Sequence, residues 1–180
     1  FFHIFFNMWF LVIFGSEVER RLGHLRYLIL YILSGLGASL FHIAFTPVGG
    51  AISLIIPALG ASGAISGVLG AFFLMYPRRR LSMCYFFLIP FCFTTTSAFF
   101  MVFWFATQII YGYMRLGGVA YFAHAGGFIT GISLLYALSE RRARPTYAPF
   151  ISFEWFPQVR RGLGTGTKAI FTALLLAAVA

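Results

Sequence analysis

The stretch GASGAISGVLG, residues 60–70, combines small residues with serines inside a chain that is otherwise built from large apolar side chains. A helix this rich in glycine lets a neighbouring helix backbone approach very closely. Ser62, near the start of the stretch, is the strongest nucleophile candidate in the sequence. What the other segments place around Ser62 therefore decides what this protein can do.

The composition is that of an integral membrane protein. Of 180 residues, 61% are hydrophobic and only 9% are charged, and the mean hydropathy is +0.90. Such a chain has too few polar side chains to solvate the surface of a soluble domain. The net charge of +9 comes from short basic clusters between apolar runs. Nucleic acid would need those charges on one solvated face, so we expect the lipid bilayer and not nucleic acid as a partner.

Long apolar runs predict an all-α polytopic membrane protein, since about 20 residues are needed to cross a bilayer core. The runs expected to form its core helices cover residues 1–15, 27–45, 57–76, 97–114 and 119–138. The predicted organisation is a core over residues 1–138, an inner linker over 139–167 and a partial extra transmembrane helix over 168–180. Both ends fall inside apolar runs, and we therefore expect a piece of a longer protein.

Arginines predict the orientation of these helices, because Lys and Arg collect in cytoplasmic loops. Alternate connections are rich in arginine, and the residues are Arg20, Arg21, Arg26, Arg78, Arg79, Arg80, Arg141, Arg142 and Arg144. The remaining connections between core runs carry only Arg115. The first, third and fifth runs should therefore begin at the outer face.

Two connecting segments are apolar without being long enough to span. Residues 81–96 are interrupted by Pro90, and we expect an interfacial or partly buried loop on the inner side. Residues 46–59 are expected to form an uncharged outer loop. Cys84 and Cys92 have no acidic or histidine neighbours, so the sequence indicates neither a metal site nor a disulfide framework.

Polar side chains occur at one depth on three of the predicted helices: His3 with Asn7, Ser62, and His124. Each lies about 14 or 15 residues from the inner end of its helix, or roughly 21–22 Å at 1.5 Å per residue. A single site built from three helices requires this equal depth. The imidazole of His124 is expected to act as the general base that activates the Ser62 hydroxyl. His3 and Asn7, spaced i and i+4, are expected to bind the oxyanion together with the backbone N–H of Ser62.

Glycines supply the close approach that such a site needs. Gly63 and Gly67 have four-residue spacing on one helix, Gly127 and Gly131 repeat it on another, and Gly60 precedes the first pair. This spacing lets two helix backbones pack directly against each other. Packing of these helices would bring the serine within reach of the histidine.

The sequence excludes several other hydrolytic centres. It has no Asp, and Glu17, Glu19, Glu140 and Glu154 all fall on the inner side, so only a Ser–His dyad is expected. The lack of Asp also excludes an aspartyl protease, and the lack of a His-Glu-x-x-His motif excludes that kind of zinc protease. The only lysine, Lys168, is too far along the chain for a Ser–Lys dyad. We expect no metal and no cofactor.

Three motifs resemble those of the rhomboid intramembrane serine proteases. They are G-x-S-G at residues 60–63, H-x-x-G-x-x-x-G at residues 124–131, and His3-x-x-x-Asn7. The resemblance covers residues 1–138 and implies a rhomboid-like helical bundle with core helices two to six, the first core helix missing and an additional C-terminal helix beginning. It implies an endopeptidase that cuts transmembrane segments of membrane proteins. We expect a multi-pass protein of a prokaryotic plasma membrane with its active site toward the outer face.

One position departs from the family pattern. Four residues after the nucleophile, where some members have an aromatic that stacks on the catalytic histidine, this chain has Ser66. The sequence therefore offers no evident residue to orient His124. On the fourth run, Trp104 is expected only to pack or anchor, and Gln108 only to bond a neighbouring helix.

Two functions besides proteolysis are compatible with a membrane helix bundle. One is an inactive rhomboid-like protein that binds membrane helices, although such proteins typically lack the serine or the histidine that are present here. The other is a channel or transporter, which is disfavoured because no polar path continues through the inner half of the helices. The sequence does not predict an oligomeric state.

Overall fold

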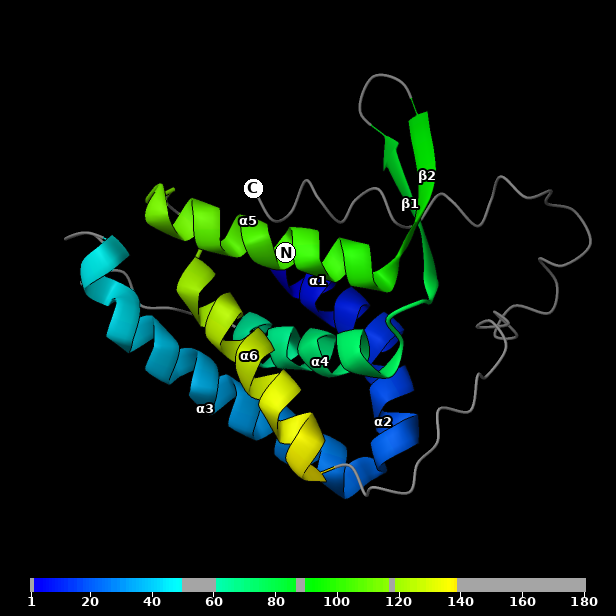
Figure 1. Cartoon of the computed structure of the whole chain (residues 1–180), viewed down its shortest axis with the longest axis horizontal. Coiled ribbons are helices and arrows are strands. Elements are labelled where there is room, and N and C mark those ends of the chain that lie inside the picture. Colours follow the sequence, from blue (N-terminus) through cyan, green and yellow to red (C-terminus); the bar gives the residue numbers. More distant parts are fainter. Residues whose placement is uncertain (1, 50–60, 87–89, 117–118, 139–180) are drawn as a thin grey trace, which may run out of the picture.

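The computed structural model describes residues 2–49, 61–86, 90–116 and 119–138 as a bundle of helices with one β-hairpin (Figure 1). In chain order the elements are α1 (Phe2–Phe10), the π-helical turn η1 (Leu11–Gly15), α2 (Ser16–Leu22), α3 (His24–Gly49), α4 (Ser62–Met75), β1 (Arg80–Phe86), β2 (Pro90–Thr96), α5 (Ser97–Tyr113) and α6 (Tyr121–Leu138). The linker and extra helix predicted over residues 139–180 lie outside the described residues.

The helices fall on the five predicted apolar runs, which confirms the helical bundle. By length and composition, His24–Val48 and Tyr121–Leu138 could each cross a membrane, while Ser62–Met75 and Ser97–Tyr113 are shorter apolar helices. Helix α3 is longer than the predicted 27–45, because it continues through Pro47 to Gly49. The first run, predicted to end at residue 15, forms α1 and η1 and continues past that end into α2.

Helix α4 is the central element of the bundle. It contacts α1, η1, α2, α3, α5 and α6, and in Figure 1 it lies behind α6. Its residues 63–72 are all buried. A membrane helix that touches this many neighbours has to present small side chains, because large ones would hold the surrounding backbones apart.

The predicted glycines lie where α4 meets α6. A Cβ built on Gly127 would overlap the carbonyl oxygen of Gly63, and one built on Gly131 would overlap that of Gly67. Gly67 also faces the Ser34 side chain of α3. Three helices therefore approach one another at distances that only glycine permits at these positions.

The segment after α4 forms an antiparallel hairpin, in which Arg80 pairs with Thr96 and Phe86 with Pro90 (Figure 1). The irregular loop predicted as one alternative for residues 81–96 is therefore wrong, because the segment forms two strands; its predicted position at the inner interface stays a prediction. Aromatic and threonine residues in this segment favour strands. Pro90 occupies the first position of β2, where a proline is tolerated.

The cysteines are a second correction in this hairpin. Cys92 is disulfide-bonded, and Cys84, the other cysteine of the chain, lies directly opposite it in the strand register. Residues directly opposite in an antiparallel pair have their Cβ atoms about 4.5–5.5 Å apart. The disulfide was not predicted because the hairpin that places the two cysteines opposite each other was not predicted.

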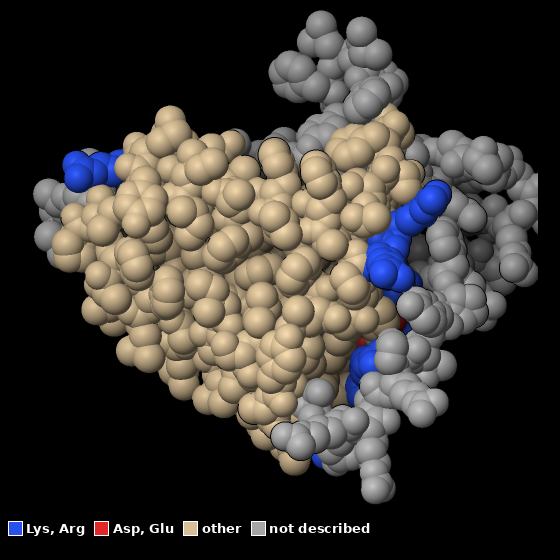
Figure 2. All heavy atoms as spheres, viewed as in Figure 1, with Lys and Arg blue, Asp and Glu red and all other residues tan. Residues whose placement is uncertain are grey.

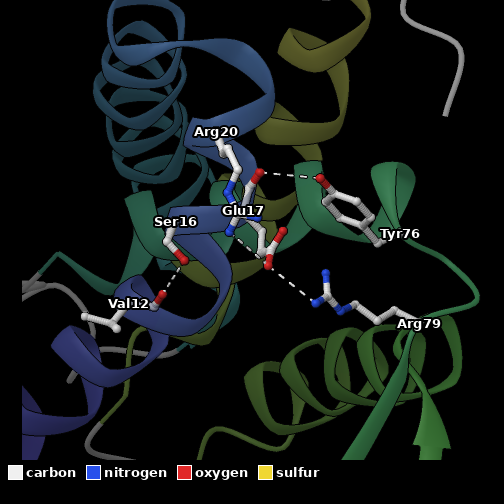
Figure 3. Close-up of polar contacts among 6 residues, drawn as sticks. All are labelled: Val12, Ser16, Glu17, Arg20, Tyr76 and Arg79. Carbon is white, nitrogen blue, oxygen red and sulfur yellow. Dashed lines mark hydrogen bonds and ion pairs between the residues drawn. The ribbon is translucent and has the colours of Figure 1, made fainter. Parts of the chain in front are cut away.

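A polar cluster joins α2 to the end of α4 (Figure 3). The Glu17 side chain is 4% exposed, and its Oε1 lies 3.2 Å from Arg20 Nη2 and 3.4 Å from Arg79 Nη2. The Tyr76 hydroxyl donates to the Glu17 carbonyl oxygen over 3.4 Å. Among the described residues on the face shown in Figure 2, Lys and Arg side chains lie at the two ends of the helix bundle, and the surface between them carries no Lys, Arg, Asp or Glu.

We expect Gly127→Ala to lower the free energy of unfolding by about 2 kcal/mol, because its Cβ would meet a backbone oxygen that cannot move aside. Gly35→Ala is the matched control, since its Cβ would lie 3.4 Å from the Ala64 Cβ, an ordinary contact. Unfolding in mixed micelles, followed by circular dichroism, measures both. Equal stability of the two variants would contradict the close packing.

We expect Glu17→Gln to lower the free energy of unfolding by about 2 kcal/mol, because it removes the carboxylate that pairs with the largely buried Arg79. The control is Glu19→Gln, which breaks the more exposed pair with His24 and should cost less than about 1 kcal/mol. The same unfolding measurement applies. A smaller effect at Glu17 than at Glu19 would show that the cluster does not stabilise the bundle.

Candidate active site

Ser62 is the first residue of α4. The first hydrogen bond of this helix runs from Ile65 N to Ala61 O over 3.0 Å, so the amide groups of residues 62–64 precede the helical hydrogen-bond ladder. Ser62 itself is half-buried. Its hydroxyl and its amide are thus both placed at the positive end of a helix, where negative charge is favoured.

His124 lies in the first turn of α6, where its backbone N–H donates to Ala120 O over 3.2 Å. The residue is 9% exposed. Its Nε2 atom is 2.9 Å from Ser62 Oγ, which is a hydrogen bond between residues 62 positions apart in the sequence. The structure therefore brings the predicted serine and histidine into direct contact.

The glycine contacts account for this geometry. Gly63 follows the serine and Gly127 comes one turn after the histidine, and their backbones meet. A side chain at Gly127 would push α6 away from α4 and lengthen the hydrogen bond, whereas one at Gly63 would meet the Ala38 side chain of α3. Gly60, which was predicted to contribute to this packing, lies outside the described residues.

Two residues of α5, missed as site residues by the sequence analysis, complete the surroundings of His124. Gln108 Oε1 is 2.9 Å from His124 Nδ1, and the Gln108 side chain is fully buried. The Trp104 ring stacks on the imidazole, with centroids 6.2 Å apart and planes inclined by 27°. Their i, i+4 spacing within an apolar run is the signal that could have found them, since it places both on one helix face.

Ser66, the departure from the family pattern, does not take the aromatic role. It donates a hydrogen bond to the Ser62 carbonyl oxygen over 2.7 Å. The ring that stacks on His124 belongs to Trp104, from a different helix. The expectation that Trp104 only packs or anchors was incomplete, whereas Gln108 does bond a neighbouring helix as predicted.

His3 and Asn7 lie on α1, which contacts α4. His3 is exposed and close enough to His124 to interact with it electrostatically, and Asn7 is half-buried. No described contact joins either residue to Ser62. Their part in binding an oxyanion stays a prediction.

The fold and the site together define a class: a polytopic membrane protein whose helix bundle encloses a hydrogen-bonded serine and histidine. Comparison with known families then identifies it. The model of the Rhomboid domain matches residues 1–141. The chain belongs to the rhomboid family.

Known relatives agree with this assignment. "Rhomboid protein 1, mitochondrial" of Saccharomyces cerevisiae is 33% identical over 141 residues, which cover 78% of this chain and 39% of the yeast protein. "RHOMBOID-like protein 1" of Arabidopsis thaliana is 33% identical over 83% of this chain and 33% of its own length. The chain thus spans well under half of these relatives. No solved structure matches the sequence significantly.

Membership of the family does not by itself show whether this protein is an active protease or in which membrane it lies. The "Rhomboid protease GluP" of Bacillus subtilis is 39% identical over 38% of this chain and 12% of its own length. The "Inactive RHOMBOID-like protein 8" of Arabidopsis thaliana is 34% identical over 39% of this chain and 18% of its own length. The relatives include mitochondrial and plant proteins and do not support the expected prokaryotic plasma membrane.

Proposed function

We propose that this protein is an intramembrane serine endopeptidase in which Ser62 is the nucleophile and His124 the general base. The observation that carries the proposal is the 2.9 Å hydrogen bond between Ser62 Oγ and His124 Nε2. A serine hydroxyl is a weak nucleophile unless an adjacent base removes its proton. This arrangement, on two helices locked together by glycines, holds the pair ready for that transfer.

The reaction would follow the usual acyl-transfer sequence. Nε2 of His124 accepts the hydroxyl proton as Ser62 Oγ attacks the peptide carbonyl, and it then gives that proton to the leaving amine. Water afterwards hydrolyses the acyl-enzyme with the histidine again acting as base. The amide of Ser62, at the start of α4, is suited to donate to the oxyanion, and we propose that His3 and Asn7 of α1 assist it.

Transmembrane segments of other proteins are the proposed substrates. Ser62 is the first residue of α4. The polar cluster that contains Glu17 and Arg79 lies beyond the other end of that helix. If arginines mark the inner side, the site lies toward the outer face, and cleavage falls near the outer end of a substrate helix. Entry would occur from the lipid past α5, with local unwinding of the substrate.

An inactive, helix-binding role is the second candidate, because one relative is named as inactive. It differs from the first in one measurable property, the reactivity of Ser62. An inactive protein would bind membrane helices without forming a covalent adduct at this serine.

We expect a fluorophosphonate to label the whole protein in liposomes. The substitution Ser62→Ala should abolish this labelling. The hydroxyl oxygen forms the bond to phosphorus, so its removal leaves no acceptor. Ser133→Ala is the control, since that exposed hydroxyl of α6 donates to Ile129 O of its own helix. Undiminished labelling of Ser62→Ala, or a lack of labelling of the native protein, would contradict the proposed activity.

We expect Asn7→Ala to lower kcat for cleavage of a transmembrane peptide by about 10²-fold while KM changes little, because an oxyanion donor acts mainly in the transition state. Met8→Ala is the control, since Met8 is an exposed neighbour on the same helix. Steady-state kinetics in liposomes separate the two constants. A rise in KM with unchanged kcat would assign Asn7 to substrate binding instead.

A further inference from the structure

Gln108 contacts the nitrogen of His124 that faces away from Ser62. Its Oε1 atom is 2.9 Å from His124 Nδ1, and its side chain is 0% exposed. The contact joins α5 to α6 across 16 residues of sequence. Serine, histidine and glutamine thus form one hydrogen-bonded chain through the two ring nitrogens.

The surroundings of the Gln108 amide set its orientation. Its Nε2 atom lies 3.3 Å from Trp104 O and 3.3 Å from Thr107 Oγ1. A backbone carbonyl can only accept, so the NH2 group must face Trp104 O, and Oε1 must face His124. The glutamine therefore presents an acceptor to the imidazole.

That acceptor dictates the tautomer of His124. Since a carbonyl oxygen cannot donate, the proton of the neutral imidazole has to reside on Nδ1. Nε2 then carries the free lone pair, and it points to Ser62 Oγ at 2.9 Å. The opposite tautomer would place an N–H against the serine and leave two acceptors facing each other at Gln108.

Trp104 restricts the tilt of the imidazole ring. It lies one helical turn before Gln108, and its ring stacks on the imidazole at 6.2 Å. The stacked indole limits tilting of the ring plane, while the hydrogen bond limits its rotation within the plane. Together the two residues leave the histidine one orientation, with Nε2 toward the serine.

We propose that Gln108 is the third member of the site, a positioning residue that sets the tautomer and orientation of His124. The proposal rests on the proposed function. During the reaction Nδ1–H becomes part of an imidazolium, and Oε1 of the amide then accepts a charge-assisted hydrogen bond, which is stronger than the one in the resting state. The glutamine takes the position that an aspartate occupies in a serine-protease triad, but without a charge.

The test compares Gln108→Met with Gln108→Glu. Methionine has a similar length but presents no oxygen to Nδ1, whereas glutamate retains the acceptor and loses the amide donors. We expect Gln108→Met to lower both the rate of fluorophosphonate labelling and kcat by about 10²-fold with little change in KM, less than the ~10⁴ seen where a triad aspartate is lost. Gln108→Glu should recover at least a tenth of the native rate.

A purely structural role predicts a different order. If Gln108 mattered only through its bonds to Trp104 O and Thr107, the glutamate would be as impaired as the methionine, because it lacks both donors. Thr107→Val removes one of the two acceptors of the Gln108 amide and leaves Oε1 in place, so it should lower the labelling rate by less than Gln108→Met does. Native labelling of Gln108→Met, or no recovery by Gln108→Glu, would overturn the proposal.

The outcomes also separate this proposal from the one on which it rests. A native protein that is not labelled at all overturns the proposed protease, while a labelled native protein with an equally labelled methionine variant overturns only the role of Gln108. Thermal unfolding shows whether each variant is folded. Should Gln108→Met not fold, the glutamate variant decides: a tenth of the native rate or more supports the acceptor role, and a loss as large as that of His124→Ala overturns it.

Discussion

The direct backbone contact between α4 and α6 is the constraint on which both the fold and the site depend. Gly127 lies against the carbonyl of Gly63, and Gly131 against that of Gly67. Lipid tails are as apolar as leucine, so helices in a bilayer gain little from burying hydrophobic side chains against each other, and association relies on close packing and polar contacts. The glycines that allow this packing also set the spacing of the Ser62–His124 hydrogen bond.

Polar contacts sit near both ends of α4. At its start, Ser62 bonds His124 of α6, and just beyond its end the Tyr76 hydroxyl bonds the Glu17 carbonyl of α2. Between these points α4 is buried, mainly among apolar side chains. The helix is therefore held at both ends by directional interactions and in the middle by steric fit. Such a helix has little freedom to slide or rotate. A site shared between helices requires this rigidity.

The sequence allowed the bundle and the serine–histidine pair to be predicted because both depend on local patterns: apolar runs, glycine spacing and equal depth along helices. It did not allow the hairpin of β1 and β2 to be predicted. In a short apolar segment interrupted by Pro90, the hydrophobic pattern does not distinguish paired strands from a loop. The disulfide at Cys92 was missed for the same reason. The neighbours of His124 on α5 were missed because helix rotation depends on packing with other helices, which a single sequence does not specify.

The lack of acidic residues near the site led to the expectation of a dyad, yet a neutral amide meets the same requirement in an apolar setting. A buried carboxylate in the membrane would carry a large desolvation cost, and only a protonated histidine would offset it. A glutamine oxygen orients Nδ1–H in the resting state at a much smaller cost, because its own amide hydrogens are accepted by Trp104 O and Thr107. An uncharged third residue therefore suits the proposed mechanism in a site enclosed by helices, because in that mechanism charge appears only while the serine proton resides on the imidazole.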